Sequence, residues 1–266
     1  MIETLQVNDW PAFVAWSDAH DGWAFRGHAS AGWTLENSLS RQLRRYCPAL
    51  DTWRDREMRA LRIFRRKAHI HLDAQHAIDD DLRCLAMMQH HGAPTRLLDF
   101  TKSPYVAAFF AFEGALHESS AVYALNTPAL WNLAPAFNAA LTRDHIDPRQ
   151  PGRYAQHFAT NQNPILWCGE PAEMDRRLIA QSGLFVVPGQ PNLSLEEILQ
   201  HYPADEPLLT KLVLPHELRS RAMQALYRMN ITHATLFPDL DGLARSIAYE
   251  LEVEWRSQPQ GMGAPD

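Results

Sequence analysis

The sequence lacks the features that would assign it to several common protein classes. It has only three cysteines, Cys47, Cys84 and Cys168, which lie far apart and form no C-x-x-C pair. This pattern indicates neither a disulfide framework nor a thiolate metal site, so we interpret the cysteines as small core residues. The first sixteen residues lack the basic start and apolar run of a signal peptide, and no later stretch is long and apolar enough to cross a bilayer. We therefore predict a cytoplasmic protein without a membrane segment.

The best-known short enzyme motifs are also absent. The chain contains no G-x-G-x-x-G, no G-x-x-x-x-G-K-[ST] and no G-x-S-x-G, which argues against the commonest dinucleotide, NTPase and hydrolase sites. The segment 215–220 begins like a zinc-binding helix, but Ser220 stands where the second histidine is needed. His69 and His71 are two residues apart and would face different ways on a helix. We predict no metal site.

Basic residues are outnumbered, with 25 Lys and Arg against 31 Asp and Glu and a net charge of −6. This balance argues against an overall basic footprint for nucleic acid, although a local basic patch stays open.

The segment Asp51–Ala74 predicts a helix capped by Asp51, because Leu61, Phe64, Ala68 and Leu72 follow a spacing of three and four. Its other face carries Arg54, Arg62, Arg65, Arg66 and Lys67. That face is either a solvated helix surface or a surface for an anionic partner.

Length and composition favour one domain. The chain has 266 residues, of which 46% are hydrophobic, and one core can support this size. We find no internal repeat or linker. We predict a single domain over residues 1–256 and a flexible tail over 257–266, which is rich in Pro, Gly and Gln.

The order of the predicted elements indicates a mixed α+β fold. An almost uniformly apolar run after Pro104 predicts a buried helix to about Leu116. Short β-favouring runs predict strands over 121–125, 184–187 and 208–214, and helices are expected over 217–229 and 240–254. The elements lack a regular βαβ rhythm. We therefore expect a small, partly antiparallel sheet flanked by helices rather than a doubly wound sheet.

A lone arginine in the segment Phe25-Arg26-Gly27 is the first candidate site residue. The guanidinium fork of Arg26 suits phosphate or carboxylate, and Gly27 would let the chain turn or let a ligand approach the backbone. The alternative is a structural Arg26 paired with a core acid such as Asp99.

A second candidate lies between Gln89 and Ser103, where polar residues are dense beside the predicted buried helix. Buried polar groups must be hydrogen-bonded or serve a ligand, because an unsatisfied group costs about 1–3 kcal/mol. Thr101 or Ser103 could instead cap the helix that starts near Pro104.

These segments resemble the FRG domain family in order. The matching motifs are Phe25-Arg26-Gly27, Gln89-His90-x-Gly92-x-Pro94-Thr95-Arg96-Leu97-Leu98-Asp99-Phe100-Thr101, Arg177-x-x-x-Gln181-x-Gly183-x-Phe185 and Leu236-Phe237-Pro238-Asp239-Leu240-Asp241-Gly242-Leu243. Phe100 stands where that family often has Trp. The resemblance covers roughly Trp10 to Leu251. It implies a bacterial protein, with a possible link to phage defence, and little about the reaction.

A second resemblance, at the level of the fold, is to ADP-ribosyltransferases. Their motifs run from an Arg or His on a first strand, through a Ser/Thr-rich strand and an apolar helix, to a Glu-bearing strand. Arg26, Thr101-Lys102-Ser103 and the segment 181–189 are similar to these three in the same order. The resemblance implies NAD as the cofactor, Arg26 and Gly27 at its phosphate or ribose, and Thr101 and Ser103 shaping the nicotinamide-ribose pocket. It further implies a polar lining from Gln89, His90, Thr95, Arg96 and Gln181.

The third motif departs from that pattern, because Gln181 and Gly183 stand where a catalytic Glu is common. A carboxylate there would help an oxocarbenium-like transition state. Asp99, Asp239 or Asp241 could supply it from another segment, or His90 could take the polar role, as in relatives that transfer to phosphate. For Asp239 and Asp241 the alternative is capping of the following helix.

Three functions follow as hypotheses. The first is an ADP-ribosyltransferase-like or NAD-cleaving enzyme with Arg26, His90 and Asp99 as candidate catalytic residues and a protein or nucleic-acid acceptor. The second is a non-catalytic module that binds a nucleotide or anion within a bacterial defence system. The third, metal-assisted hydrolysis by His90, His91 and Asp99, conflicts with the rarity of adjacent histidines on one ion.

Overall fold

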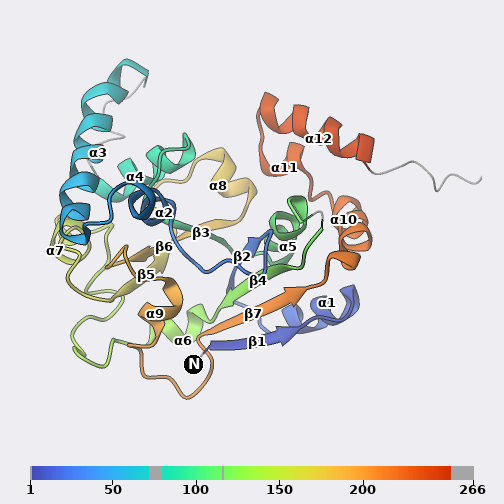
Figure 1. Ribbon diagram of the computed structural model, residues 1–266, viewed down its shortest axis with the longest axis horizontal. Helices are drawn as coiled ribbons and strands as arrows, with labels where there is room; N and C mark the ends of the chain where they lie inside the picture. Colours follow the sequence, from blue (N-terminus) through green and yellow to red (C-terminus); the bar gives the residue numbers. More distant parts are fainter. Residues whose placement is uncertain (1, 72–79, 116, 253–266) are drawn as a thin grey trace, which may run out of the picture.

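The computed structural model describes residues 2–71, 80–115 and 117–252 (Figure 1). The strands are β1 (Ile2–Gln6), β2 (Ala24–His28), β3 (Leu98–Thr101), β4 (Ser120–Leu125), β5 (Leu166–Gly169), β6 (Gly183–Pro188) and β7 (Leu209–Leu214). The helices are α1 (Trp10–Asp18), α2 (Ser38–Tyr46), α3 (Trp53–Ala68), α4 (Asp81–His90), α5 (Pro104–Glu113), α6 (Thr127–Trp131), α7 (Arg153–His157), α8 (Arg176–Ala180), α9 (Leu195–Leu199), α10 (Arg219–Arg228), α11 (His233–Leu236) and α12 (Leu240–Glu252). The tail predicted over 257–266 lies outside the described residues.

The strands form one seven-stranded sheet in the order β1-β7-β4-β2-β3-β6-β5. Only β1 and β7 pair in parallel, and the other neighbours are antiparallel. The predicted α+β class, with a partly antiparallel sheet flanked by helices, is confirmed. The three predicted strands also appear, as β4, β6 and β7, each shifted by one residue at most at either end.

Helix α5 packs against the centre of the sheet, as its apolar sequence predicts. Ser103 caps it by accepting a hydrogen bond from the Val106 amide (3.3 Å), and Pro104 occupies the first turn. Ala107, Ala108 and Phe109 are buried in a core shared with α1 and α10. A second cluster between the sheet and α9 covers the other face, and a third joins β5 and β6 to α3 and α4.

The predicted helix over 51–74 is shorter in the structure. Asp51, the predicted cap, lies in a 3-10 turn over Leu50–Thr52, and Thr52 precedes α3 without a side-chain capping bond. A second 3-10 turn, His69–His71, follows α3, and residues 72–74 lie outside the described part. In the described part of the chain, no helix combines the length and apolarity needed to span a membrane.

The cysteines occupy the positions expected of small core residues only in part. Cys84 and Cys168 are buried, whereas Cys47 is half-buried at the end of α2, and all three are free thiols. Burial is the largest cause that raises the pKa of Cys84 to about 11, so this thiol stays protonated at neutral pH.

Candidate functional site

The candidate site lies where β2 and β3 separate. These neighbouring strands share a single register pair, Phe25 with Thr101. Beyond it, the Arg26 side chain bridges the two strands, because its Nη1 donates to the backbone carbonyl of Asp99 at 2.6 Å. The gap between the strands opens into a cavity of about 890 Å³.

Gly27 is needed for packing. A Cβ at this position would lie 2.0 Å from the Ala107 carbonyl oxygen and 2.5 Å from the Ala111 amide nitrogen, both on α5. Backbone atoms of a buried helix cannot move aside cheaply. Gly27 therefore lets α5 sit directly on β2, beside the cavity that it also lines.

Two neutral acceptors hold the Arg26 guanidinium. Besides its bond to the Asp99 carbonyl, its Nε donates to His28 Nε2 at 3.2 Å. Its Nη2 makes no hydrogen bond to the residues that the structure describes. Burial lowers the pKa of Arg26, and the Asp99 charge opposes that effect, but arginine remains protonated. The sequence had offered a structural Arg26 paired with Asp99 as the alternative. In the structure Arg26 contacts Asp99 through a hydrogen bond to its backbone carbonyl and not through its carboxylate.

His28 is neutral over the physiological range. Burial, followed by the charges of Arg26 and Arg41, lowers the pKa of His28 to about 3, against a small raising effect of the Trp33 backbone. Because Nε2 accepts from Arg26, the proton of the neutral ring belongs on Nδ1. His28 thus holds the Arg26 side chain in place through a neutral acceptor. Because the ring carries no negative charge, it does not neutralise the Arg26 charge that would bind an anion.

Three arginines line the cavity without carboxylate partners. Arg26, Arg41 and Arg177 form no ion pair with any described residue. Arg41 donates to the backbone carbonyl of Glu36 (2.6 Å), and Arg177 lies over the ring of Phe237 (4.6 Å to its centroid). Unpaired guanidinium groups around one cavity provide donors for an anion.

Three carboxylates also line the cavity, and two of them are paired. Glu36 contacts Arg44 Nε at 2.6 Å, and Glu113 contacts His233 Nε2 at 2.7 Å. Asp99 forms no ion pair in the described part of the chain. Its Oδ1 accepts from Gln89 Nε2 at 2.7 Å, which leaves Oδ2 without a hydrogen bond to the described residues. Asp99 is therefore the cavity carboxylate that remains available to a ligand.

Thr101 and Gln181 join the segment 181–189 to the segments that carry Arg26 and Thr101. Thr101 pairs with Gly183 of β6, and its Oγ1 donates to the Gln181 carbonyl at 2.7 Å. The Gln181 amide donates to the Leu236 carbonyl at 3.1 Å. Arg26, Thr101 and Gln181, which are far apart in the sequence, thus line the same cavity.

A smaller groove adjoins the cavity and shares Asp99, Arg177 and Gln181 with it. Gln89 and His90 line this groove from α4. His90 Nδ1 lies 3.0 Å from Asp175 Oδ2, while Asp175 Oδ1 caps α8. His90 is therefore near the candidate site but not among the residues that line the main cavity.

Other predicted residues lie away from the cavity. Arg96 is fully buried and forms an ion pair with Glu57, and it also donates to the Phe158 carbonyl and the Asn161 side chain, both at 2.7 Å. Thr95 is buried and hydrogen-bonds to Gln89 and Ser38. These contacts give Arg96 and Thr95 structural roles.

Ser103 and Asp239 lie at helix ends. Ser103 caps α5, and Asp239 caps α12 by accepting from the Gly242 amide at 2.8 Å. Neither residue lines the cavity, and Asp241 does not line it either. The capping alternative is therefore confirmed for Ser103 and Asp239.

Sequence reasoning did not select Arg41, His28 and Arg177 as site residues. Arg177 belonged to a quoted motif, so a signal for it was present, and His28 directly follows Phe25-Arg26-Gly27. Arg41 gave no signal, because only the fold brings α2 to the cavity. Among the described residues, no group of three or more His, Cys, Asp or Glu side chains could hold a metal ion.

Residues 21–120, which include β2, β3 and α5, match the family model of the FRG domain. No curated protein and no solved structure matches the chain.

Proposed function

Since this chain contains an FRG domain, we propose that it is an ADP-ribosyltransferase-like protein that binds NAD and cleaves its nicotinamide–ribose bond. One observation carries the proposal: Arg26, Thr101 and Gln181 lie on or beside the adjacent strands β2, β3 and β6 and line one cavity. The sequence resemblance to ADP-ribosyltransferases rests on the same three segments in the same order.

The cavity suits a dinucleotide in size and charge. Its volume of about 890 Å³ lies within the range of small-molecule sites, about 300–1,000 Å³. Arg26, Arg41 and Arg177 would hold the diphosphate, with the free Nη2 of Arg26 as one donor. NAD supplies the glycosidic bond whose cleavage releases nicotinamide, and the ADP-ribosyl group passes to water or to a nucleophile of the acceptor.

Asp99 is the residue that we assign to charge stabilisation. Positive charge develops on the ribose when a glycosidic bond of this kind breaks, and a nearby carboxylate stabilises it. Asp99 is the cavity carboxylate without an ion-pair partner in the described part of the chain. We propose that it replaces the glutamate that is absent at Gln181 and Gly183.

A non-catalytic nucleotide-binding module is the second candidate, and Gln181 favours it. An amide cannot supply negative charge, and this one already donates to the Leu236 carbonyl. In that case the same arginines would bind the ligand without turnover. A protein or nucleic-acid acceptor, a cytoplasmic location and a role in bacterial defence belong to the proposal as well.

Incubation with NAD, followed by quantification of free nicotinamide, tests the proposal. We expect release by the wild type and by Arg176→Ala, which removes an exposed arginine that does not line the cavity. We expect Asp99→Asn to lower the rate by about 10²-fold or more, as for loss of one electrostatic stabiliser, and Arg26→Ala to abolish release.

Calorimetric titration of NAD, run in parallel, separates the two candidates. Binding without nicotinamide release, when water is the only acceptor, would reject NAD hydrolysis and favour the recognition module. Neither binding nor release would reject NAD as the ligand. Full activity of Asp99→Asn would remove Asp99 from the mechanism.

A further inference from the structure

The outer face of α3 is strongly basic, although the whole chain is acidic. Its exposed charged residues are six cations, Arg54, Arg56, Arg59, Arg62, Arg66 and Lys67, and one acid, Asp55. None of the six forms an ion pair with the residues that the structure describes. By contrast, Arg65 on the same helix pairs with Asp81 at 2.5 Å.

The spacing of these cations concentrates charge on one side of the helix. Arg59, Arg62 and Arg66 are three and four residues apart, which places them in a row opposite the buried Leu61 and Ala68. Like charges at these spacings destabilise a helix. At about 1.5 Å per residue this row spans about 10 Å of the helix, and all six cations, from Arg54 to Lys67, span about 20 Å. An extended polyanion would neutralise it.

Helix α2 continues the basic surface toward the cavity. Trp53 at the start of α3 is buried against Leu39 and Leu43 of α2, and its Nε1 donates to the Cys47 carbonyl at 2.9 Å. This packing fixes the two helices to each other, and Figure 1 shows them side by side. The solvent-facing Arg41 of α2 also lines the cavity. Arg41 therefore brings the basic residues of α2 to the cavity lining.

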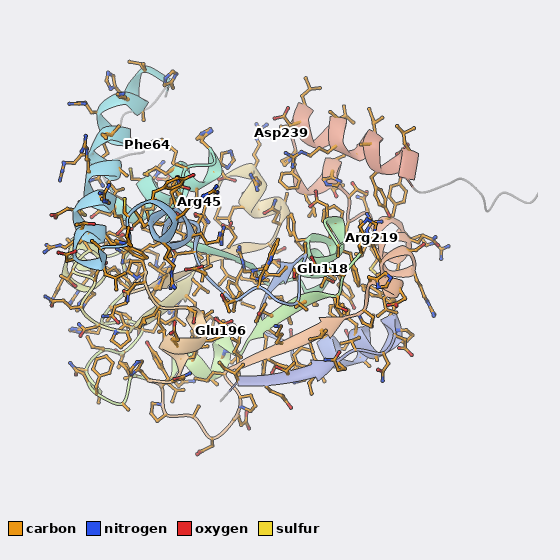
Figure 2. The ribbon with its side chains drawn as sticks, in the orientation of Figure 1. Arg45, Phe64, Glu118, Glu196, Arg219 and Asp239 are labelled. Atoms are coloured by element: carbon orange, nitrogen blue, oxygen red, sulfur yellow. The ribbon has the colours of Figure 1, made fainter. Side chains whose placement is uncertain are left out.

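An exposed aromatic ring lies within this surface. Tyr46, at the end of α2, is 62% exposed, and the guanidinium of Arg45 lies 5.3 Å from its ring centroid. Figure 2 marks Arg45 on α2 and the partly buried Phe64 on α3. Trp33, which lines the cavity, is 57% exposed. Cationic side chains interspersed with exposed aromatic rings are the combination that binds unpaired nucleotides, through phosphates and stacked bases.

We propose that this basic strip, made of Arg41, Arg45 and Tyr46 of α2 and the six cations of α3, binds single-stranded nucleic acid. The phosphates contact the row on α3, and bases stack on Tyr46. The strand then runs along α2 to the cavity mouth at Arg41. This inference goes beyond the proposed function, because binding to the strip requires neither NAD nor catalysis.

Fluorescence anisotropy tests the strip. The full chain is titrated against a labelled single-stranded 20-mer and against its duplex, without NAD, at salt concentrations between 50 and 200 mM. The test variant is Arg59→Glu with Arg62→Glu. Its matched control, Arg221→Glu with Arg228→Glu, makes the same charge change on exposed positions of α10. Circular dichroism melting checks that both variants fold.

We expect the wild type to bind the single strand more tightly than the duplex, with affinity falling as salt rises. The α3 variant should bind the single strand at least 10-fold more weakly. It should also lower the magnitude of the slope of log K against log salt by about 1.4, because each lost phosphate contact on a single strand lowers it by about 0.7. The α10 control should keep wild-type affinity. Tyr46→Ala should weaken single-strand binding severalfold and leave duplex binding unchanged.

Other outcomes would overturn the inference. Lack of wild-type binding at 50 mM salt would reject a nucleic-acid surface. Equal losses in the α3 and α10 variants would show that net charge, and not the strip, controls binding. If polyglutamate displaced the labelled strand as well as unlabelled single strand does, the partner would be an acidic polypeptide. Tighter binding of the duplex than of the single strand would reject the single strand as the ligand.

Discussion

Arg26 is oriented by two neutral acceptors, the Asp99 carbonyl and His28 Nε2. A carboxylate in either place would cancel part of its charge before a ligand arrived. A neutral acceptor fixes the side chain and leaves its charge available. The low pKa of His28, about 3, keeps the ring in its accepting form. His28 is therefore the residue whose titration reports on this arrangement.

Acidification should destabilise the wild type more than His28→Gln, which keeps a possible acceptor but does not titrate. The unfolded histidine takes up a proton below its ordinary pKa of 6.5, whereas the folded ring does so only near 3. The stability from His28 is therefore complete above pH 6.5 and is lost as the pH falls toward 3. Between pH 7 and 4.5 the differential loss should reach about 2–3 kcal/mol.

Urea unfolding of both proteins at these two pH values measures that difference. Parallel stability profiles would mean that His28 titrates normally in the folded protein. That result would contradict the neutral-acceptor role, because an ordinary pKa would make His28 a cation beside Arg26 at mildly acidic pH.

At the scale of elements, the contact between β2 and α5 positions the site. Gly27 brings the helix backbone against the strand, and Ser103 starts the helix directly after the Thr101 segment. The strand that bears Arg26 and the helix that closes the cavity are thus fixed to each other. The apolar run after Pro104 predicted α5 well, but nothing local in the sequence indicated which strand it covers.

Gly27→Ala should therefore be strongly destabilising. Its Cβ would overlap backbone atoms of α5, and overpacking of this kind costs about 1–3 kcal/mol or more. Gly32→Ala is the matched control, since Gly32 also lines the cavity but its added Cβ would meet only the Ser30 Oγ at 3.5 Å. Urea unfolding should show the loss for Gly27→Ala alone. Equal stability of the two variants would contradict the close packing.

Some elements could not be predicted because their sequence signals are weak. Strand β5 has four residues, Leu166–Gly169, and all are buried, so no alternation marks it. Helix α2 is short, and only the fold shows that Arg41 reaches the cavity. The strands β4, β6 and β7 carry longer β-favouring runs and were predicted.

At the scale of the molecule, the site joins segments that are distant in the sequence. Arg26, Thr101 and Gln181 were predicted from motifs, and the sheet order brings their strands together. Arg96 shows the limit of that reasoning. Its motif position suggested a ligand contact, but the side chain is buried with Glu57. A motif does not reveal whether a side chain points into a cavity or into the core.

We propose that the unpaired arginines of the cavity bind the diphosphate of an ADP-ribosyl group. Calorimetric titration with ADP-ribose, on the wild type and Arg26→Ala, tests it directly. We predict saturable binding by the wild type that weakens about 10- to 150-fold in the variant, equivalent to about 1.5–3 kcal/mol for a charge-assisted hydrogen bond. Equal affinity of the two proteins, or no binding by the wild type, would contradict the claim.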